Sequence, residues 1–304
     1  MPAMTADQWQ GVFPAITTPF AEDGTVDHTF LAGHARRLLA SGCRGLVALG
    51  SLGEGATLTG PEKLAILRTC VQAVGDRIPV VAGISALSTV DAVSLARAAA
   101  EAGCGGLMVL PPYVYQGDWP EMRSHVSAVI DATPLSCLLY NNPIAYGTDF
   151  VPEQVRAFCD HANLHAVKES SGDVRRFTAL RALLRDRLAL FVGMDDAVLE
   201  GVAMGATGWV AGLVNALPDE SVLLFEHAIA GRTAQARTLY EWFLPLLRLD
   251  TVPKFVQLIK LVQEEVGLGS ERVRAPRAVL AGAEREMVLA IIRERLASKP
   301  AKSS

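Results

Sequence analysis

The feature that most constrains the fold is an alternation of short apolar runs with longer helix-period segments, repeated eight times within residues 1–212. Such alternation with short connections is typical of a parallel sheet covered by helices. The apolar runs predict strands at Val12–Thr18, Gly45–Gly50, Val80–Gly83, Gly106–Leu110, Cys137–Tyr140, His165–Lys168, Ala189–Val192 and Gly208–Ala211. The intervening segments predict helices at Phe30–Ala40, Glu62–Val74, Val90–Ala102, Trp119–Ala132, Pro152–His161, Val174–Arg185 and Ala197–Met204.

The number of units decides between two parallel architectures. Eight units fit a closed (β/α)8 TIM barrel better than an open doubly wound sheet, which has about five or six strands. We therefore predict an α/β fold with a barrel over residues 1–212, an open sheet being the alternative. After residue 212 only helical patterns follow, which predicts a C-terminal helical extension over 213–298 and a disordered tail over 299–304. The extension's expected helices are Glu220–Ala230, Thr233–Leu247, Pro253–Val266 and Pro276–Leu296.

Composition and charge exclude several classes of protein. The formal net charge of −4 argues against a nucleic-acid or membrane-surface partner, because both require a basic face. No apolar run approaches the roughly 18 residues of a membrane span, and the start MPAMTADQWQG lacks the pattern of a signal peptide. The five cysteines form no CxxC pair and the six histidines no HExxH motif. We expect a cytoplasmic enzyme with reduced thiols and no metal.

Lys168 is the strongest catalytic candidate, because catalytic groups of barrels lie at the carboxyl ends of strands. Of the six lysines it alone ends an apolar strand, in HAVKESSG. A barrel interior desolvates the ammonium and lowers its pKa, which makes a neutral amine available to attack a carbonyl or imine carbon. The alternative is a lysine that extends to the barrel mouth or pairs with Glu169.

Three further segments end or follow predicted strands. In GSLGEGATLT, converging backbone N–H groups and the Ser51 hydroxyl could bind a carboxylate. The alternative is that this glycine-rich turn between a strand and a helix serves only the backbone conformation. Tyr140 in LLYNNP and Tyr113 in VLPPYVY could relay protons beside a Schiff base, or could be packed core tyrosines. Asp195 and Asp196 follow the seventh strand, and we expect them to cap the next helix.

On these motifs the chain resembles the dihydrodipicolinate synthase / N-acetylneuraminate lyase superfamily along essentially its whole length. GSLGEGATLT is similar to the family's carboxylate loop, LLYNNP to its tyrosine strand and AVKESSGD to its Schiff-base strand. The resemblance implies that Lys168 forms the imine, Tyr140 relays protons, Ser51 links the relay to the substrate carboxylate, and Tyr113 is a second relay tyrosine that often crosses a subunit interface. It also implies a homotetramer, built as a dimer of dimers, that acts on a small keto acid or cyclic imino acid without a cofactor. The substrate-binding residues it implies or suggests are Ser51, Leu52, Gly53, Asn142, Ser170, Gly193 and Val210.

Two departures from the synthase pattern bear on the substrate. Ala145 stands where the synthase has an arginine, and Leu52 replaces a second hydroxyl residue. The stretches YNNPIAYGTD, KESSGDVRRF and YEWFLPLLRLD, and the run FVGMDDAVLEGVAMGATGWVAGLVNALP, instead resemble Δ1-pyrroline-4-hydroxy-2-carboxylate deaminase of hydroxyproline catabolism. That enzyme releases ammonia and α-ketoglutarate semialdehyde, and Asn142 and Ser170 are then candidates to contact the C4 hydroxyl. The alternatives are a 2-keto-3-deoxy-sugar-acid aldolase or dehydratase, a dihydrodipicolinate synthase-like enzyme, and a catalytically dead ligand-binding barrel.

Overall fold

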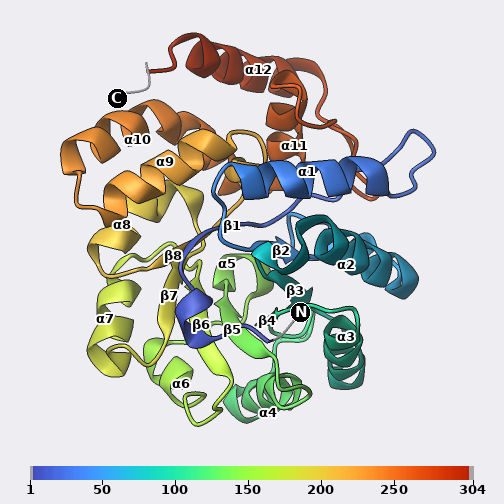
Figure 1. Cartoon of the computed structure of the whole chain (residues 1–304), viewed down its shortest axis with the longest axis vertical. Helices are drawn as coiled ribbons and strands as arrows, with labels where there is room; N and C mark the ends of the chain where they lie inside the picture. The colour runs from blue at the N-terminus through green and yellow to red at the C-terminus, as the bar shows by residue number, and fades with distance from the viewer. Residues whose placement is uncertain (1–2, 301–304) are drawn as a thin grey trace.

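The eight expected strands form one parallel sheet that closes on itself (Figure 1). In the computed structural model, which describes residues 3–300, the strands from β2 to β8 each pair with the next strand in the chain, and β1 pairs with β8. A bridge between Ala15 and Val47, and a hydrogen bond of 2.9 Å from Arg44 N to Val12 O, join β1 to β2 and close the ring. The predicted (β/α)8 barrel is confirmed. The strands are β1 (Gly11–Pro14), β2 (Leu46–Ala48), β3 (Val80–Ile84), β4 (Gly106–Val109), β5 (Ser136–Asn141), β6 (Leu164–Glu169), β7 (Ala189–Val192) and β8 (Gly208–Ala211).

Helices surround the sheet because each carries one apolar face. In α3, Ala92, Ala96 and Ala99 are all fully buried, and their spacing places them on one side of the helix, where small side chains allow close approach to the sheet. The Thr59 side chain caps α2 and the Ser88 side chain caps α3, each by accepting a hydrogen bond from a backbone N–H of the first turn. The outer helices are α1 (His28–Ala40), α2 (Gly60–Val74), α3 (Thr89–Glu101), α4 (Trp119–Ile130), α6 (Pro152–Arg156), α7 (Arg175–Leu184), α8 (Val198–Ala203) and α9 (Pro218–Ile229).

Short helical turns complete the connections between these elements. A one-turn helix, α5 (Pro143–Tyr146), follows β5. The 3-10 turns are η1 (Ala6–Gln8), η2 (Gly55–Thr57), η3 (Gly75–Arg77), η4 (Asp195–Ala197), η5 (Leu213–Asn215) and η6 (Arg248–Asp250). None of the helices within residues 3–300 has the length and apolar character needed to cross a membrane.

The two-residue period of the strands separates the inside of the barrel from its outer layer. Along β6, Ala166 belongs to the cluster inside the barrel, whereas Val167 belongs to the larger cluster between sheet and helices. Lys168 therefore points inward again, above Ala166 at the carboxyl end of the strand. Below it, the rings of Phe13 and Phe191 meet edge to face at 5.3 Å and fill the bottom of the barrel.

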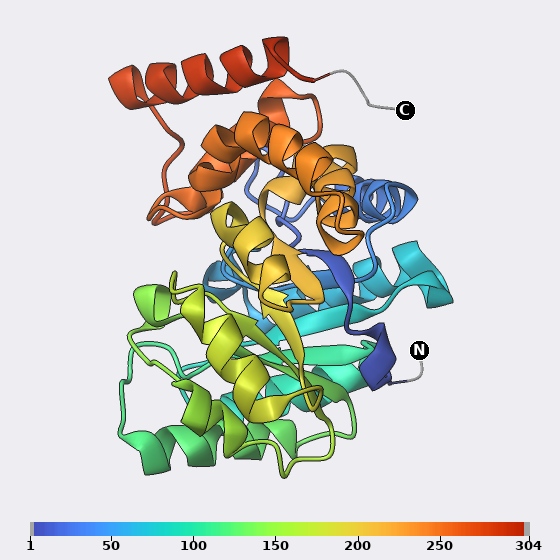
Figure 2. The same ribbon diagram turned by 90° about the vertical axis from the view of Figure 1, so that its left-hand side faces the viewer.

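The C-terminal extension consists of α10 (Thr233–Leu247), η6, α11 (Phe255–Glu265) and α12 (Gly282–Ala297), with α12 outermost (Figure 2). Because α9 packs against β1 and α8, we propose that the barrel extends through α9 rather than ending at residue 212. The last helix begins at Gly282 instead of Pro276, since Arg274 is held in an extended segment by bonds to Glu54 and Glu62. Of the expected tail, residues 301–304 lie outside the described residues.

Candidate active site

A cavity of about 380 Å3 lies at the carboxyl ends of the strands. A larger hollow of about 660 Å3 lies at the opposite end, lined by Gly11, Arg44 and Arg77, where barrel enzymes do not carry out chemistry. The smaller cavity is therefore the candidate site. Of the residues predicted from the sequence, it is lined by Ser51, Leu52, Tyr140, Asn142, Lys168, Gly193 and Val210.

Lys168 lies at the floor of this cavity, between Tyr140 and Phe191 in the register of the neighbouring strands. It is only 6% exposed, and its Nζ is 4.1 Å from the centre of the Tyr140 ring. Glu169 does not pair with it, because that carboxylate accepts hydrogen bonds from Asn141 Nδ2 at 3.1 Å and from Ser171 N at 2.6 Å. Lys168 thus presents its amine to the cavity beside a phenol.

A chain of hydroxyl groups runs along one side of the site. The Ser51 and Tyr146 hydroxyls form a short hydrogen bond, and Tyr146 in turn bonds to Tyr113, which bonds to Ser85. The Tyr146 ring lies 5.7 Å from that of Tyr113 and 5.9 Å from that of Tyr140. Burial raises the pKa of Tyr113, and raises the pKa of Tyr146 well above its usual value, so both phenols hold their protons at neutral pH.

Tyr146, the centre of this chain, was not among the predicted site residues. It ends α5, whose start is set by Asn142: the Asn142 Oδ1 accepts a hydrogen bond from Ala145 N at 3.0 Å, and Pro143 occupies the first turn. The same amide donates from Nδ2 to the Tyr140 hydroxyl at 2.9 Å. Asn142 therefore links the position of Tyr140 to the helix that presents Tyr146. The Asn-Pro pair after a strand is the sequence signal that could have identified this helix.

The glycine-rich loop that carries Ser51 is anchored by a buried ion pair. Glu54 is fully buried with a positive φ of 55°, and it accepts hydrogen bonds from Lys260 Nζ at 2.6 Å and from Arg274 N at 3.0 Å. In the same loop, Gly53 O accepts a hydrogen bond of 2.6 Å from Thr18 Oγ1. Gly53 is not among the residues that line the cavity. The loop is therefore held by Thr18, which follows β1, and by Lys260 and Arg274 of the C-terminal extension.

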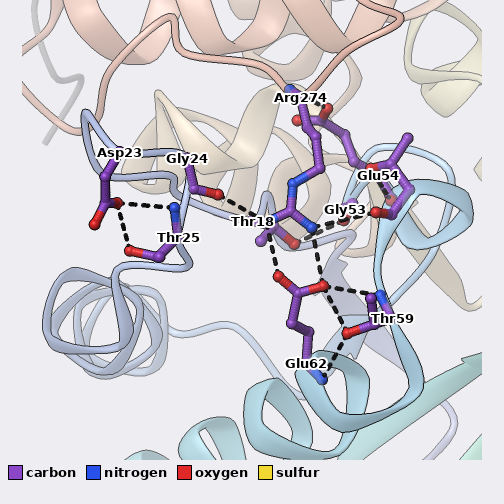
Figure 3. Close-up of polar contacts among 10 residues, drawn as sticks. Thr18, Asp23, Gly24, Thr25, Gly53, Glu54, Thr59, Glu62 and Arg274 are labelled. Carbon is purple, nitrogen blue, oxygen red and sulfur yellow. Dashed lines mark hydrogen bonds and ion pairs between the residues drawn. The ribbon is translucent and has the colours of Figure 1, made fainter.

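A second ion pair reinforces the same junction at its outer edge. Figure 3 shows Arg274 reaching from the extension to Glu62 on α2, with distances of 2.8 and 3.0 Å to the two carboxylate oxygens. Arg274 also donates to Gly24 O at 2.7 Å. The hydrogen bond from Arg274, aided by Thr59, lowers the pKa of Glu62 to about 2. Through Arg274 the extension therefore binds both the loop before α1 and the start of α2.

Two carboxyl groups converge on Gly212 at the other side of the site. Asp195 is fully buried and accepts hydrogen bonds from Trp209 Nε1 at 2.9 Å, Gly212 N at 3.1 Å and Leu213 N at 2.8 Å. The prediction that Asp195 caps a helix is therefore wrong, because its carboxylate joins β7 to the turn after β8. Burial raises its pKa to about 6.

The second carboxyl, Asp250, comes from η6 in the extension and lines the cavity. Its Oδ1 is buried and has no hydrogen-bond partner within residues 3–300. A Cβ added to Gly212 would lie 2.0 Å from this oxygen, so only glycine leaves room for the carboxyl. Asp250 is not among the predicted site residues, although it ends the stretch YEWFLPLLRLD that resembles the deaminase.

Of the remaining predicted residues, Gly193 lies against Lys168 and Ser170. A Cβ on Gly193 would lie 1.9 Å from Ser170 Oγ and 2.6 Å from Lys168 Cε, so glycine is required there. Ser170 is 1% exposed and its hydroxyl has no partner among the described residues. Leu52 and Val210 supply apolar walls. Within the described part of the chain no cluster of three or more His, Cys, Asp or Glu side chains is arranged to hold a metal ion.

Comparison with known proteins relates the whole barrel to one family. The profile of the dihydrodipicolinate synthetase family matches residues 8–295. The 4-hydroxy-tetrahydrodipicolinate synthase of Haloarcula marismortui is 32% identical over 274 residues, which cover 90% of this chain and 89% of the relative. The synthase of Natronomonas pharaonis is 37% identical over 238 residues, covering 78% and 80% of the two chains.

Solved structures give the same picture. The dihydrodipicolinate synthase of Acinetobacter baumannii, determined in complex with pyruvate, superimposes with a TM-score of 0.90 at 28% identity and covers 94% of this chain and 98% of its own. All three relatives carry the synthase name. The names agree better with the synthase-like alternative than with the deaminase that the subfamily stretches suggest.

Proposed function

The chain belongs to the dihydrodipicolinate synthetase family, and from this premise we propose that it deaminates Δ1-pyrroline-4-hydroxy-2-carboxylate to α-ketoglutarate semialdehyde through a Schiff base on Lys168. The observation that carries the proposal is the cavity around Lys168. It has a phenol relay on one side, a buried carboxyl on the other, and Ala145 at the position where the synthase pattern has an arginine.

The proposed reaction uses the imine as an electron sink. Lys168 attacks C2 of the cyclic imine, and transimination opens the ring and leaves a free amine at C5. Tyr140 relays a proton from C3, and the resulting enamine expels the C4 hydroxyl as water. Isomerisation gives an imine at C5, whose hydrolysis releases ammonia and α-ketoglutarate semialdehyde. Every step relies on a protonated Schiff base and general acid–base groups, so the chemistry needs no metal or organic cofactor.

The geometry is compatible with the roles that we propose for these residues. Lys168 Nζ lies over the Tyr140 ring, 4.1 Å from its centre, so this phenol is next to the amine that would form the imine. The Ser51 hydroxyl lies at the junction of the tyrosine chain and the anchored loop, where it can donate to the substrate carboxylate while the phenols pass protons. Tyr113 stands one phenol further back, behind Tyr146.

The lining of the cavity favours a substrate with one carboxylate and a small ring. Among the residues that line it, Lys168 is the only cation, while Leu52, Ile144, Ala145 and Val210 are apolar. A second anionic or zwitterionic substrate would lack a cationic partner there once Lys168 is engaged as the imine. A hydroxylated cyclic imine needs no second substrate, because all of its reacting atoms belong to one molecule.

The second candidate is 4-hydroxy-tetrahydrodipicolinate synthase activity, which the names of the relatives favour. The pyruvate bound by the Acinetobacter baumannii enzyme is an α-keto acid that a lysine at this strand end could also capture. The keto-deoxy-sugar-acid aldolase or dehydratase is a variant of the same lysine chemistry. The decisive difference is the product, since only the deaminase releases ammonia.

One assay separates these activities. The purified chain is given the pyrroline, and ammonia and α-ketoglutarate semialdehyde are followed together; we expect equal amounts of both, and none from Lys168→Ala. Parallel reactions contain pyruvate with the synthase's aldehyde co-substrate, or a keto-deoxy sugar acid. Condensation or pyruvate release without ammonia from the pyrroline would reject the deaminase proposal. Failure of borohydride to trap any substrate on Lys168 would favour a binding protein without activity.

We also propose the homotetramer that the resemblance implies. Leu87, Val114 and Ile144, in the segments that follow β3, β4 and β5, are 70%, 89% and 69% exposed, and a subunit contact at these segments would bury them. The chain mass is 32.4 kDa, so light scattering distinguishes a tetramer from a dimer or monomer without ambiguity.

A further inference from the structure

We propose that Asp250 is the proton donor to the hydroxyl group that leaves C4, with Asp195 as the positioning residue behind it. This role rests on the proposed deaminase function and identifies the acid that the reaction needs. A hydroxide is a poor leaving group, so the bond between C4 and oxygen breaks readily only if a neighbouring acid protonates the departing oxygen.

The first observation is the position of the Asp250 side chain. It lines the same 380 Å3 cavity as Lys168 and Tyr140, and its Oδ1 is buried without a hydrogen-bond partner in the described part of the chain. Buried polar atoms in folded proteins are nearly always paired, and an exception calls for an explanation such as a catalytic role. A substrate hydroxyl in the cavity would supply the missing partner.

The second observation is that Asp195 cannot serve in its place. Its two oxygens are occupied by the indole of Trp209 and the backbone N–H groups of Gly212 and Leu213. Gly212 donates to Asp195 while its missing side chain leaves room for Asp250, so both carboxyls are positioned by one residue. Both Asp195 oxygens therefore already accept hydrogen bonds from the protein. Asp250 is the carboxyl whose Oδ1 is left to bind a substrate hydroxyl.

The third observation concerns the protonation state. Burial is the main cause that raises the pKa of Asp250 well above its usual value, and the neighbouring Asp195 raises it further, while Lys168 opposes both. Asp196 on η4 also raises this pKa, and Arg248 on η6 faces Asp196 at 3.9 Å. Two carboxyls in one buried place cannot both ionise easily, so Asp250 enters the reaction as a neutral acid.

The fourth observation is the arrangement around the barrel. Tyr140 is on β5 and Tyr146 follows it, Lys168 is on β6, and Asp250 approaches Gly212 after β8. A substrate bound to Lys168 thus has the phenols on one side and the carboxylic acid on the other. Removal of the C3 proton and protonation of the C4 oxygen require such an arrangement of base and acid.

The proton balance closes over the cycle. The electron pair of the C3–H bond forms the enamine, which then expels the C4 oxygen as the Asp250 proton moves to it, giving water and an Asp250 carboxylate. That carboxylate accepts a proton from C5 in the isomerisation that follows, which restores the acid. The isomerisation forms new C–H bonds at C3 and at C4. One takes the proton that the tyrosine relay removed from C3, and the other takes the proton that the C5 amine nitrogen loses as it becomes the imine. No oxidant or reductant is required.

The test compares Asp250→Asn with the native chain and with Asp196→Asn, a neighbouring carboxyl outside the cavity lining. Because Asp196 only raises the pKa of Asp250, Asp196→Asn should keep kcat and move the basic limb to lower pH. We expect kcat of Asp250→Asn to fall by about 10²–10⁴-fold, the usual effect of a general acid, with KM nearly unchanged. Borohydride should still trap substrate on Lys168, and the trapped adduct should retain the C4 oxygen, heavier by one water than the dehydrated adduct. The basic limb of the native kcat–pH profile should disappear.

The outcomes are distinct. If the native enzyme releases ammonia and Asp250→Asn keeps its kcat and pH profile, or traps only the dehydrated adduct, the role of Asp250 is refuted and the function stands. If the native enzyme releases no ammonia, the proposed function fails and this role with it. If Asp250→Asn does not fold, Asp250→Glu is decisive because it retains an acid: turnover with a basic limb supports the role, and a folded variant that traps only the dehydrated adduct overturns it.

Discussion

Replacement of Glu54 by glutamine tests whether the buried ion pair holds the carboxylate loop. The side chains of Glu54 and Lys260 are 0% and 2% exposed, and the carboxylate accepts Lys260 at Oε1 and the Arg274 backbone at Oε2. An amide has one acceptor oxygen and no charge, so Glu54→Gln leaves a buried ammonium without its counter-ion and one donor unsatisfied. We expect the free energy of unfolding to fall by about 3–5 kcal/mol, the cost of breaking a buried pair on one side.

Urea unfolding followed by circular dichroism and by tryptophan fluorescence measures this loss. The control is Glu62→Gln, which removes a partly exposed pair with Arg274, for which we expect a loss of about 1 kcal/mol or less. Glu54→Leu combined with Lys260→Met should be more stable than either single variant, because no unpaired charge remains. If Glu54→Gln unfolds within about 1 kcal/mol of the native chain, the pair does not anchor the loop as argued.

Two further predictions concern the relay and pH. Tyr146→Phe keeps the ring contacts with Tyr113 and Tyr140 but breaks the hydroxyl chain. We therefore expect kcat to fall by about 10²-fold or more, while borohydride still traps the Schiff base. An unchanged kcat in steady-state kinetics would contradict the relay. The pKa of Glu62 is lowered from 4.5 to about 2, so its contribution to stability is present above pH 4.5 and is lost as the pH falls toward 2. Acid unfolding curves of the native chain and Glu62→Gln should therefore converge over that interval, and a constant difference between them would contradict this assignment.

Much of the barrel follows from patterns that are local in the sequence. The apolar runs at Ala189–Val192 and Gly208–Ala211 coincide with β7 and β8 residue for residue. The alternation along β6 places Lys168 on the inner face, and the position of the lysine at the end of that strand then places it at the mouth. These features could be predicted because strand period and helix caps depend on neighbours in the chain.

The rest of the site depends on contacts between distant segments. Glu54 and Lys260 are 206 positions apart. Asp250 reaches the cavity because η6 packs against η4 and brings its side chain next to Gly212. Tyr146 enters through a one-turn helix too short to give a periodic signal. The position of Asp195 after β7 favours a helix cap, whereas its burial beside Trp209 decides its partners.

The formation of an imine between Lys168 and the pyrroline tests the central claim most directly. The native chain is incubated with the substrate and borohydride, digested, and analysed by mass spectrometry, with Lys168→Ala as the control. The proposed mechanism predicts that the peptide containing Lys168 gains the mass of the reduced substrate adduct and that activity is lost in proportion. An unmodified Lys168 peptide in an enzyme that still turns over would contradict it.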